Sequence, residues 1–273
     1  MSQVIDVWMQ HPTKDFQNHE MFASLRRWNN MELVKEDLPV AHTLAAMDQA
    51  NVGLGILSAW YGHNGPLLSN EHVADIIQKN PDRFRGLASV DIMNPVAGLK
   101  DLAQWTADKG FVGVRQLPWI WGLPPTDRHF YPLWARCSEL GLPVCLQVGH
   151  TGPMRASEVG RPIPYIDEMA LDFPDLTIVC GHIGYPWTQE MIAVATKYPN
   201  VYIDTSAYTA KRYPPELVQY MKTNGRKKVL FGSNFPMITP GKCLQGLEAF
   251  GLDDQTRDDF LFGNAQRVFG LSG

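Results

Sequence analysis

Two histidines stand where apolar segments of the chain end beside glycine. His150 belongs to residues 148–152 (VGHTG) and His182 to residues 180–184 (CGHIG). Imidazole exchanges protons close to the working pH of most enzymes, so this pair is suited to general acid–base catalysis. The alternative is structural, with both rings hydrogen-bonded to hold loops in place. Because the neighbouring glycines let a ligand approach the backbone, the sequence favours a catalytic role.

Two further apolar segments end in residues that cannot act as bases. Asn234 closes residues 229–236, and its amide can hold a substrate oxygen or an oxyanion. Trp8 and Gln10 close the opening segment, residues 4–10. We expect Gln10 to polarise a substrate carbonyl together with Asn234, and the Trp8 ring either to lie against a flat substrate or to pack beneath a loop.

Charged and aromatic side chains follow other apolar segments. Arg115 either clamps a substrate carboxylate with its planar guanidinium or pairs with Asp91 or Asp204. Asp204 either orients a histidine and accepts a proton or caps the next helix. Trp60 and Tyr208 complete the set, and their rings are expected to contact a flat substrate.

The arrangement of apolar segments predicts the fold that positions these residues. Eight short segments are rich in apolar and β-branched residues, as strands covered on both faces are: 4–8, 52–59, 84–90, 113–117, 143–148, 176–180, 201–204 and 228–231. Helical periodicity fills the intervals, at 44–51, 70–80, 97–109, 130–140, 166–173, 189–198, 214–224 and 254–261. Eight βα units predict a closed (β/α)₈ TIM barrel that takes up residues 1–273 as one domain. Its catalytic residues belong at the carboxyl ends of the strands, where the side chains above fall.

Composition limits the classes of partner. A net charge of -4 gives no reason to expect a nucleic acid or an anionic membrane surface. No apolar stretch approaches the ~20 residues of a membrane span, and the first residues do not resemble a signal peptide. The four cysteines lack paired spacing, which predicts buried free thiols. We therefore expect a cytoplasmic protein whose partner is a small carboxylate.

An ordered series of motifs resembles the amidohydrolase superfamily, specifically the amidohydrolase-2 branch that is similar to aminocarboxymuconate-semialdehyde decarboxylase. The series runs over nearly the whole chain and includes NPDRFRG (80–86), GVRQLP (113–118), HTG (150–152), DFPDL (172–176), GHIG (181–184), NVYID (200–204) and GNAQRVF (263–269). The resemblance implies a (β/α)₈ barrel that acts on small carboxylated compounds by decarboxylation, hydration, or lactone or C–C hydrolysis. Relatives are often dimers, so it also implies a homodimer.

The resemblance also implies where a metal would bind. The metal-binding members place His-x-His on strand 1, a histidine on strand 5 and an aspartate on strand 8. The matching residues here are Trp8, Gln10, His150 and Asn234, so one of the four ligands is kept. A zinc site needs three or four nitrogen, sulfur or anionic oxygen ligands. We therefore expect no cofactor, with zinc or manganese held through His150 and His182 as the alternative.

An arginine from the segment after strand 1 reaches a substrate carboxylate in relatives. Arg26 and Arg27 match that region, and their alternative is a solvated basic pair. The leading hypothesis is a metal-independent hydrolase of a small carboxylated lactone, ester or dione, in which His150 or His182 activates water. The first alternative is a non-oxidative decarboxylase of a small aromatic or muconate-type acid, in which a histidine protonates carbon. The second is a catalytically inactive barrel that binds a small acid.

Overall fold

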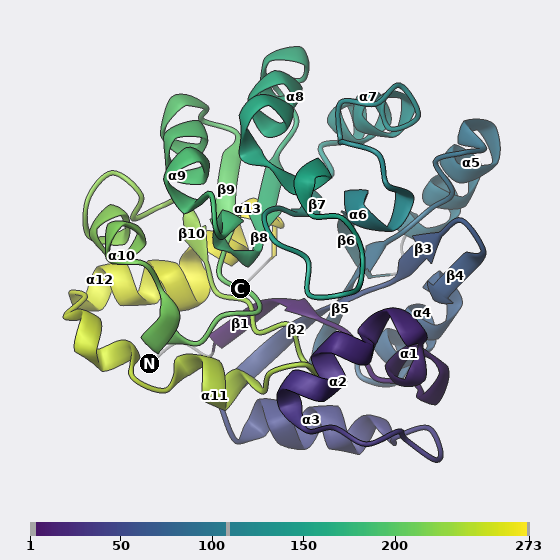
Figure 1. Ribbon diagram of the computed structural model, residues 1–273, viewed down its shortest axis with the longest axis horizontal. Coiled ribbons are helices and arrows are strands. Elements are labelled where there is room, and N and C mark those ends of the chain that lie inside the picture. Colours follow the sequence, from purple (N-terminus) through teal and green to yellow (C-terminus); the bar gives the residue numbers. More distant parts are fainter. Residues whose placement is uncertain (1–3, 108–109, 272–273) are drawn as a thin grey trace.

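The computed structural model describes residues 4–107 and 110–271. Eight parallel strands curve into a nearly closed barrel (Figure 1), and they neighbour one another in sequence order. They are β1 (Val4–Met9), β2 (Val52–Ser58), β5 (Phe84–Ala88), β6 (Phe111–Gln116), β7 (Val144–Gln147), β8 (Ile178–Gly181), β9 (Val201–Asp204) and β10 (Val229–Leu230). Each coincides with a predicted strand to within a few residues, and the predicted (β/α)₈ barrel is confirmed.

Helices cover the outer face of the barrel in Figure 1. Ser69 caps α4 (Asn70–Lys79) by accepting a hydrogen bond from the His72 amide, and Gly141 ends α7 (Tyr131–Leu140) in the left-handed conformation that glycine favours. The predicted helix at 97–109 ends earlier, and residues 108 and 109 lie outside the described residues. The main helices are α3 (Val40–Asp48), α4 (Asn70–Lys79), α5 (Pro95–Thr106), α7 (Tyr131–Leu140), α8 (Asp167–Asp172), α9 (Thr188–Lys197), α10 (Pro215–Lys222), α11 (Pro240–Leu244), α12 (Asp254–Asp258) and α13 (Asn264–Val268).

The barrel interior is packed by small and branched apolar side chains. Ile5, Ile56 and Leu87 contribute to this inner core, and Ala265 and Phe269, in and just after α13, pack against them. Burial of these chains is the main driving force for closing the sheet. All four cysteines are buried and free, as expected.

The seam between β1 and β10 extends beyond the two residues of β10. The Asn234 amide donates to the Trp8 carbonyl at 2.8 Å, and the Gln10 amide donates to the Phe235 carbonyl at 2.9 Å. These bonds continue the sheet and bring the ends of the first and last strands together. Gln10 and Asn234, far apart in the chain, are thereby neighbours.

Short elements that the sequence analysis missed form a roof over the carboxyl ends of the strands. They are α1 (Lys14–Asn18), α2 (Ala23–Asn29), α6 (Pro118–Trp121) and a hairpin of β3 (Trp60–Gly62) and β4 (Gly65–Leu68). The Phe16 ring lies 4.9 Å from Phe22 and 5.0 Å from Trp60, between ring centroids. In the described part of the chain, no helix has both the length and the apolar character that crossing a membrane requires.

Candidate active site

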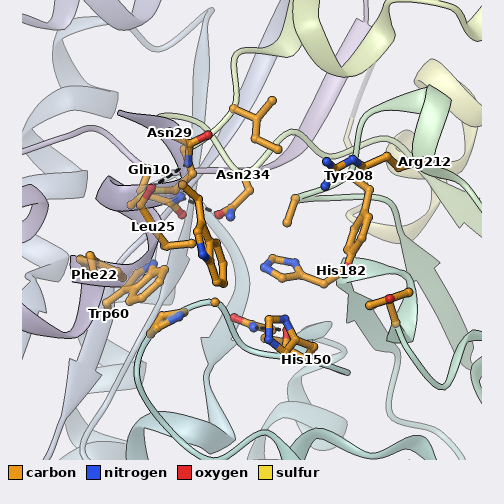
Figure 2. Close-up of a pocket in the computed structure, with 18 residues that line it drawn as sticks. Gln10, Phe22, Leu25, Asn29, Trp60, His150, His182, Tyr208, Arg212 and Asn234 are labelled. Carbon is orange, nitrogen blue, oxygen red and sulfur yellow. Dashed lines mark hydrogen bonds between the residues drawn. The ribbon is translucent and has the colours of Figure 1, made fainter. Parts of the chain in front are cut away.

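A cavity of about 690 Å³ lies at the carboxyl ends of the strands, within the size range of small-molecule sites. Figure 2 shows Phe22 and Trp60 on one side, Tyr208 and Arg212 on the other, and His150 and His182 between them. The full lining is Gln10, Phe22, Leu25, Trp28, Asn29, Trp60, Gln147, His150, Gly152, Pro153, His182, Tyr185, Ala207, Tyr208, Arg212, Asn234, Met237 and Ile238.

His182 is buried directly after β8. Its Nδ1 lies 2.7 Å from the Ser206 hydroxyl oxygen, and the Ser206 amide donates to the Asp204 carboxylate at 2.8 Å. Burial, and then the electrostatic effect of the neighbouring Arg115 and His150, lower the pKa of His182 to about 3. The imidazole is therefore neutral at neutral pH, and its ring nitrogens are suited to donating or accepting a hydrogen bond. Asp204 does not line the cavity, and its carboxylate accepts hydrogen bonds from the backbone amides of Ser206 and His182.

His150 lies in the loop after β7, and its side chain is open to solvent at the cavity mouth. Its amide donates to the Tyr185 carbonyl at 2.5 Å. Gly149, with φ +95°, could carry no Cβ there, because that atom would lie 2.4 Å from the same carbonyl. The exposed Trp28 ring stacks on the imidazole with 6.3 Å between centroids. An accessible imidazole under an aromatic cover is placed to exchange protons with both solvent and a bound molecule.

Gln10 and Asn234 meet at the top of the seam. The Gln10 side-chain amide donates to the Asn234 carbonyl oxygen at 2.9 Å, and both line the cavity (Figure 2). Gln10 Oε1 is buried without a partner among the described residues. Asn234 has φ +67°, a conformation that asparagine tolerates better than most residues. The pair presents amide groups, and no charge, to the cavity.

Arg212 is a cavity residue that the sequence analysis missed. It ends the turn Ala210–Arg212 after β9 and lies beside Tyr208 in Figure 2. Among the described residues of the lining, it carries the one permanent charge, and none is an aspartate or a glutamate. Burial raises the pKa of Tyr208, and the Arg212 guanidinium partly opposes that rise. Nothing in the sequence distinguishes Arg212 from a solvated loop arginine.

The arginines that the sequence singled out lie elsewhere. Arg26 donates to the Gln17 carbonyl at 2.6 Å and to the His19 carbonyl at 3.0 Å, which ties α2 to the preceding turn. Arg27 is exposed and does not line the cavity. The solvated alternative describes Arg27 better than a substrate clamp does, and Arg26 has a structural role.

Trp8 and Arg115 are fully buried below the cavity lining, contrary to the prediction that they contact substrate. The reason is geometric: both side chains point into the barrel interior, where the Arg115 guanidinium carbon lies 3.2 Å from the Trp8 ring centroid. Arg115 donates to the Val7 carbonyl at 3.3 Å. No ion pair joins it to Asp91 or Asp204 in the structure.

The residues present do not fit a divalent ion. Among the described residues, no group of three His, Cys, Asp or Glu side chains is placed to share one. His150 and His182 are both in the cavity, but Gln10 and Asn234 beside them are neutral amides already bonded to each other. Structural and catalytic zinc sites need at least three strong ligands.

Comparison with known proteins assigns this chain to a family. The amidohydrolase family matches residues 15–271. The chain is 22% identical to 2-amino-3-carboxymuconate-6-semialdehyde decarboxylase of Dictyostelium discoideum over 236 residues, which cover 74% of this chain and 65% of that protein. A TIM-barrel protein of Bordetella bronchiseptica superposes with a TM-score of 0.84 at 25% identity, covering 98% of this chain and 99% of that one.

A second solved structure has the same fold and contains a bound metal and an inhibitor. It is a dihydroxybenzoic acid decarboxylase of a Polaromonas species with bound manganese and the inhibitor 2-nitroresorcinol, with a TM-score of 0.72 at 17% identity over 99% of this chain and 98% of that one. With a family match over most of its length, this chain belongs to the amidohydrolase family, in its amidohydrolase-2 branch.

Proposed function

We propose that this protein is a non-oxidative decarboxylase of a small planar carboxylic acid. The observation that carries the proposal is the charge of the cavity: aromatic walls, one guanidinium, two imidazoles and no carboxylate among its described lining residues. Such a cavity favours a flat anion. The relatives named as decarboxylases support this reaction over the hydrolysis that led the sequence analysis.

The geometry supports a division of labour between the two histidines. Neutral His182, held through Nδ1 by Ser206, accepts a hydrogen bond from a substrate hydroxyl and so raises the electron density of the ring without taking its proton. His150 donates a proton to the carbon that bears the carboxylate. The C–C bond then breaks, its electron pair returns to the ring, and CO₂ leaves. The sum is one carboxylate and one proton converted to one C–H bond and one CO₂.

Arg212 orients the substrate by pairing with an oxygen anion on its ring or side chain. A hydrogen bond to a charged group contributes about 1.5–3 kcal/mol, so Arg212→Gln is expected to raise KM by roughly 10- to 150-fold with a smaller effect on kcat. Arg155→Gln is the matched control, since that exposed arginine does not line the cavity. Arg27→Gln is a second control. The sequence analysis gave Arg27 a role in binding the substrate carboxylate, whereas we propose that role for Arg212.

The deciding experiment is product analysis with a panel of hydroxybenzoates, including 2,6-dihydroxybenzoate, and of small carboxylated lactones. The proposal expects CO₂ from a hydroxybenzoate and, in D₂O, deuterium at the carbon that carried the carboxylate. His150→Gln and His182→Gln should each lower kcat by about 10²–10⁴-fold. Acid release from a lactone without CO₂ would establish the hydrolase instead. Binding without turnover across both series would establish the inactive barrel.

A further inference from the structure

The Trp8 ring crosses the barrel directly below the cavity. Trp8 is fully buried, and its ring centroid lies 4.7 Å from that of His182. At the end of β8, a Cβ on Gly181 would lie 2.1 Å from an atom of the same ring. The glycine before His182 is therefore required by the indole. Trp8 also occupies the position at which metal-binding members of the family carry a ligand.

Arg115 supports this ring from below. Its guanidinium carbon lies 3.2 Å from the ring centroid, well within the range of a cation–π interaction, which is strongest where water is excluded. Arg115 is fully buried, and its Nε and Nη1 have no partner among the described residues. Burial lowers the pKa of Arg115 only to about 10, and the carboxylates of Asp204 and Asp6 oppose that shift. The side chain is therefore charged at neutral pH.

A divalent ion and this guanidinium are poorly compatible in one buried space. An ion at the family's position would meet an indole in place of one imidazole and the bonded amides of Gln10 and Asn234 in place of two further ligands. It would also lie near the positive charge of Arg115 at a low effective dielectric constant. Two features of the site therefore disfavour a bound metal: the family's ligands are replaced, and a positive charge lies nearby.

We infer that the Arg115 guanidinium, held against the underside of the Trp8 ring, takes the place of a divalent ion as the fixed positive charge beneath the cavity. This assignment is independent of the reaction proposed above, since it describes the charge under the cavity and names no substrate. It predicts that restoring the family's ligands is insufficient to restore metal binding while Arg115 is present.

The test compares two variants by zinc content, zinc affinity and thermal shift with added ZnCl₂. The first restores the ligands through Trp8→His, Gln10→His and Asn234→Asp, and the second adds Arg115→Met. We expect the wild type to retain no zinc after dialysis, and the second variant to bind zinc at least about tenfold more tightly than the first, because one repulsive charge has been removed. The first variant with Arg155→Met added is the control for loss of any arginine.

A measurement on the unmodified protein keeps the inference testable where these variants fail to fold. The guanidinium N–H protons of Arg115, assigned by NMR in isotope-labelled protein, should be shifted upfield by the indole ring current. Ordinary shifts for those protons would overturn the inference. So would one zinc or manganese per wild-type chain that survives dialysis, or equal zinc affinity with and without Arg115.

Discussion

Gly181→Ala tests whether the Trp8 ring is clamped as the structure shows. Gly181 has φ −78° and ψ 161°, extended angles that alanine adopts without strain, so any cost comes from contact alone. The new Cβ would lie 2.1, 2.6 and 2.9 Å from three atoms of the Trp8 ring. The ring cannot retreat easily, since Arg115 lies 3.2 Å from its centroid.

The expected cost follows from overpacking of a rigid core. Such insertions cost about 1–3 kcal/mol, and the clamp on the ring places this one near about 3 kcal/mol. For a chain of this size, each kcal/mol lowers Tm by roughly 2–4 °C, so the fall should be roughly 6–12 °C. Urea and thermal unfolding measure it directly. Gly241→Ala is the matched control: its Cβ meets nothing nearer than 3.8 Å, and helix α11 should gain about 0.5–1 kcal/mol.

A double variant identifies the cause. Trp8→Leu replaces the indole with a smaller side chain and so removes the ring atoms that the new methyl group contacts. Gly181→Ala should therefore cost much less stability in that background. The coupling free energy between the two changes is expected to exceed about 1 kcal/mol. Wild-type stability in Gly181→Ala, or the same cost with and without the Trp8 ring, would refute the packing described here.

Four further predictions concern buried charge, backbone strain and the mouth of the cavity. Because the pKa of His182 falls to about 3 on folding, the unfolded chain binds the extra proton between that value and about 6.5. Wild-type stability should therefore fall as pH is lowered through this window, and less steeply in His182→Gln, as urea titrations at several pH values would show. Asp6 has the opposite effect, because burial raises its pKa to about 7. The free energy of unfolding that Asp6 contributes therefore decreases as pH rises from about 4 to 7. Asp6→Asn should gain stability relative to wild type over that range. Asn234→Ala should be about 1 kcal/mol less stable than Asn234→Gly, because φ is +67° there. Trp28→Ala should change stability by less than about 1 kcal/mol, since 56% of that side chain is exposed, yet speed the chemical modification of His150.

The sequence predicted the barrel well because burial on both faces gives parallel strands a recognisable composition. The strand at Val201–Asp204 was predicted with its observed bounds. The roof was missed because α1, α2 and the hairpin are three to seven residues long, too short for a period to appear. Trp60 was assigned to a strand end and proves to begin β3, which turns its ring toward Phe16.

Site residues were predictable where the barrel places them and unpredictable where loops do. His182 follows β8 directly, and His150 and Asn234 lie a few residues beyond the ends of β7 and β10; all three line the cavity. Arg115 also lies at a strand end, but its side chain faces the interior, and no sequence period distinguishes the rim of a barrel from its core. Arg212 reaches the cavity only because of the path of the turn after β9, which depends on tertiary contacts.

The backbone at the ends of the last three strands explains how the cavity is kept in shape. His182, Ile183, Ala207 and Asn234 all have positive φ, between 53° and 68°. For a β-branched residue such as Ile183 this conformation is rare, and each such residue costs about 1–3 kcal/mol. The strain persists only because the surrounding barrel and roof leave these residues no other arrangement. Donors and acceptors stabilise developing charge best when they are fixed in place before the reaction. Strain concentrated on three neighbouring strand ends is therefore consistent with a site preorganised by its own backbone.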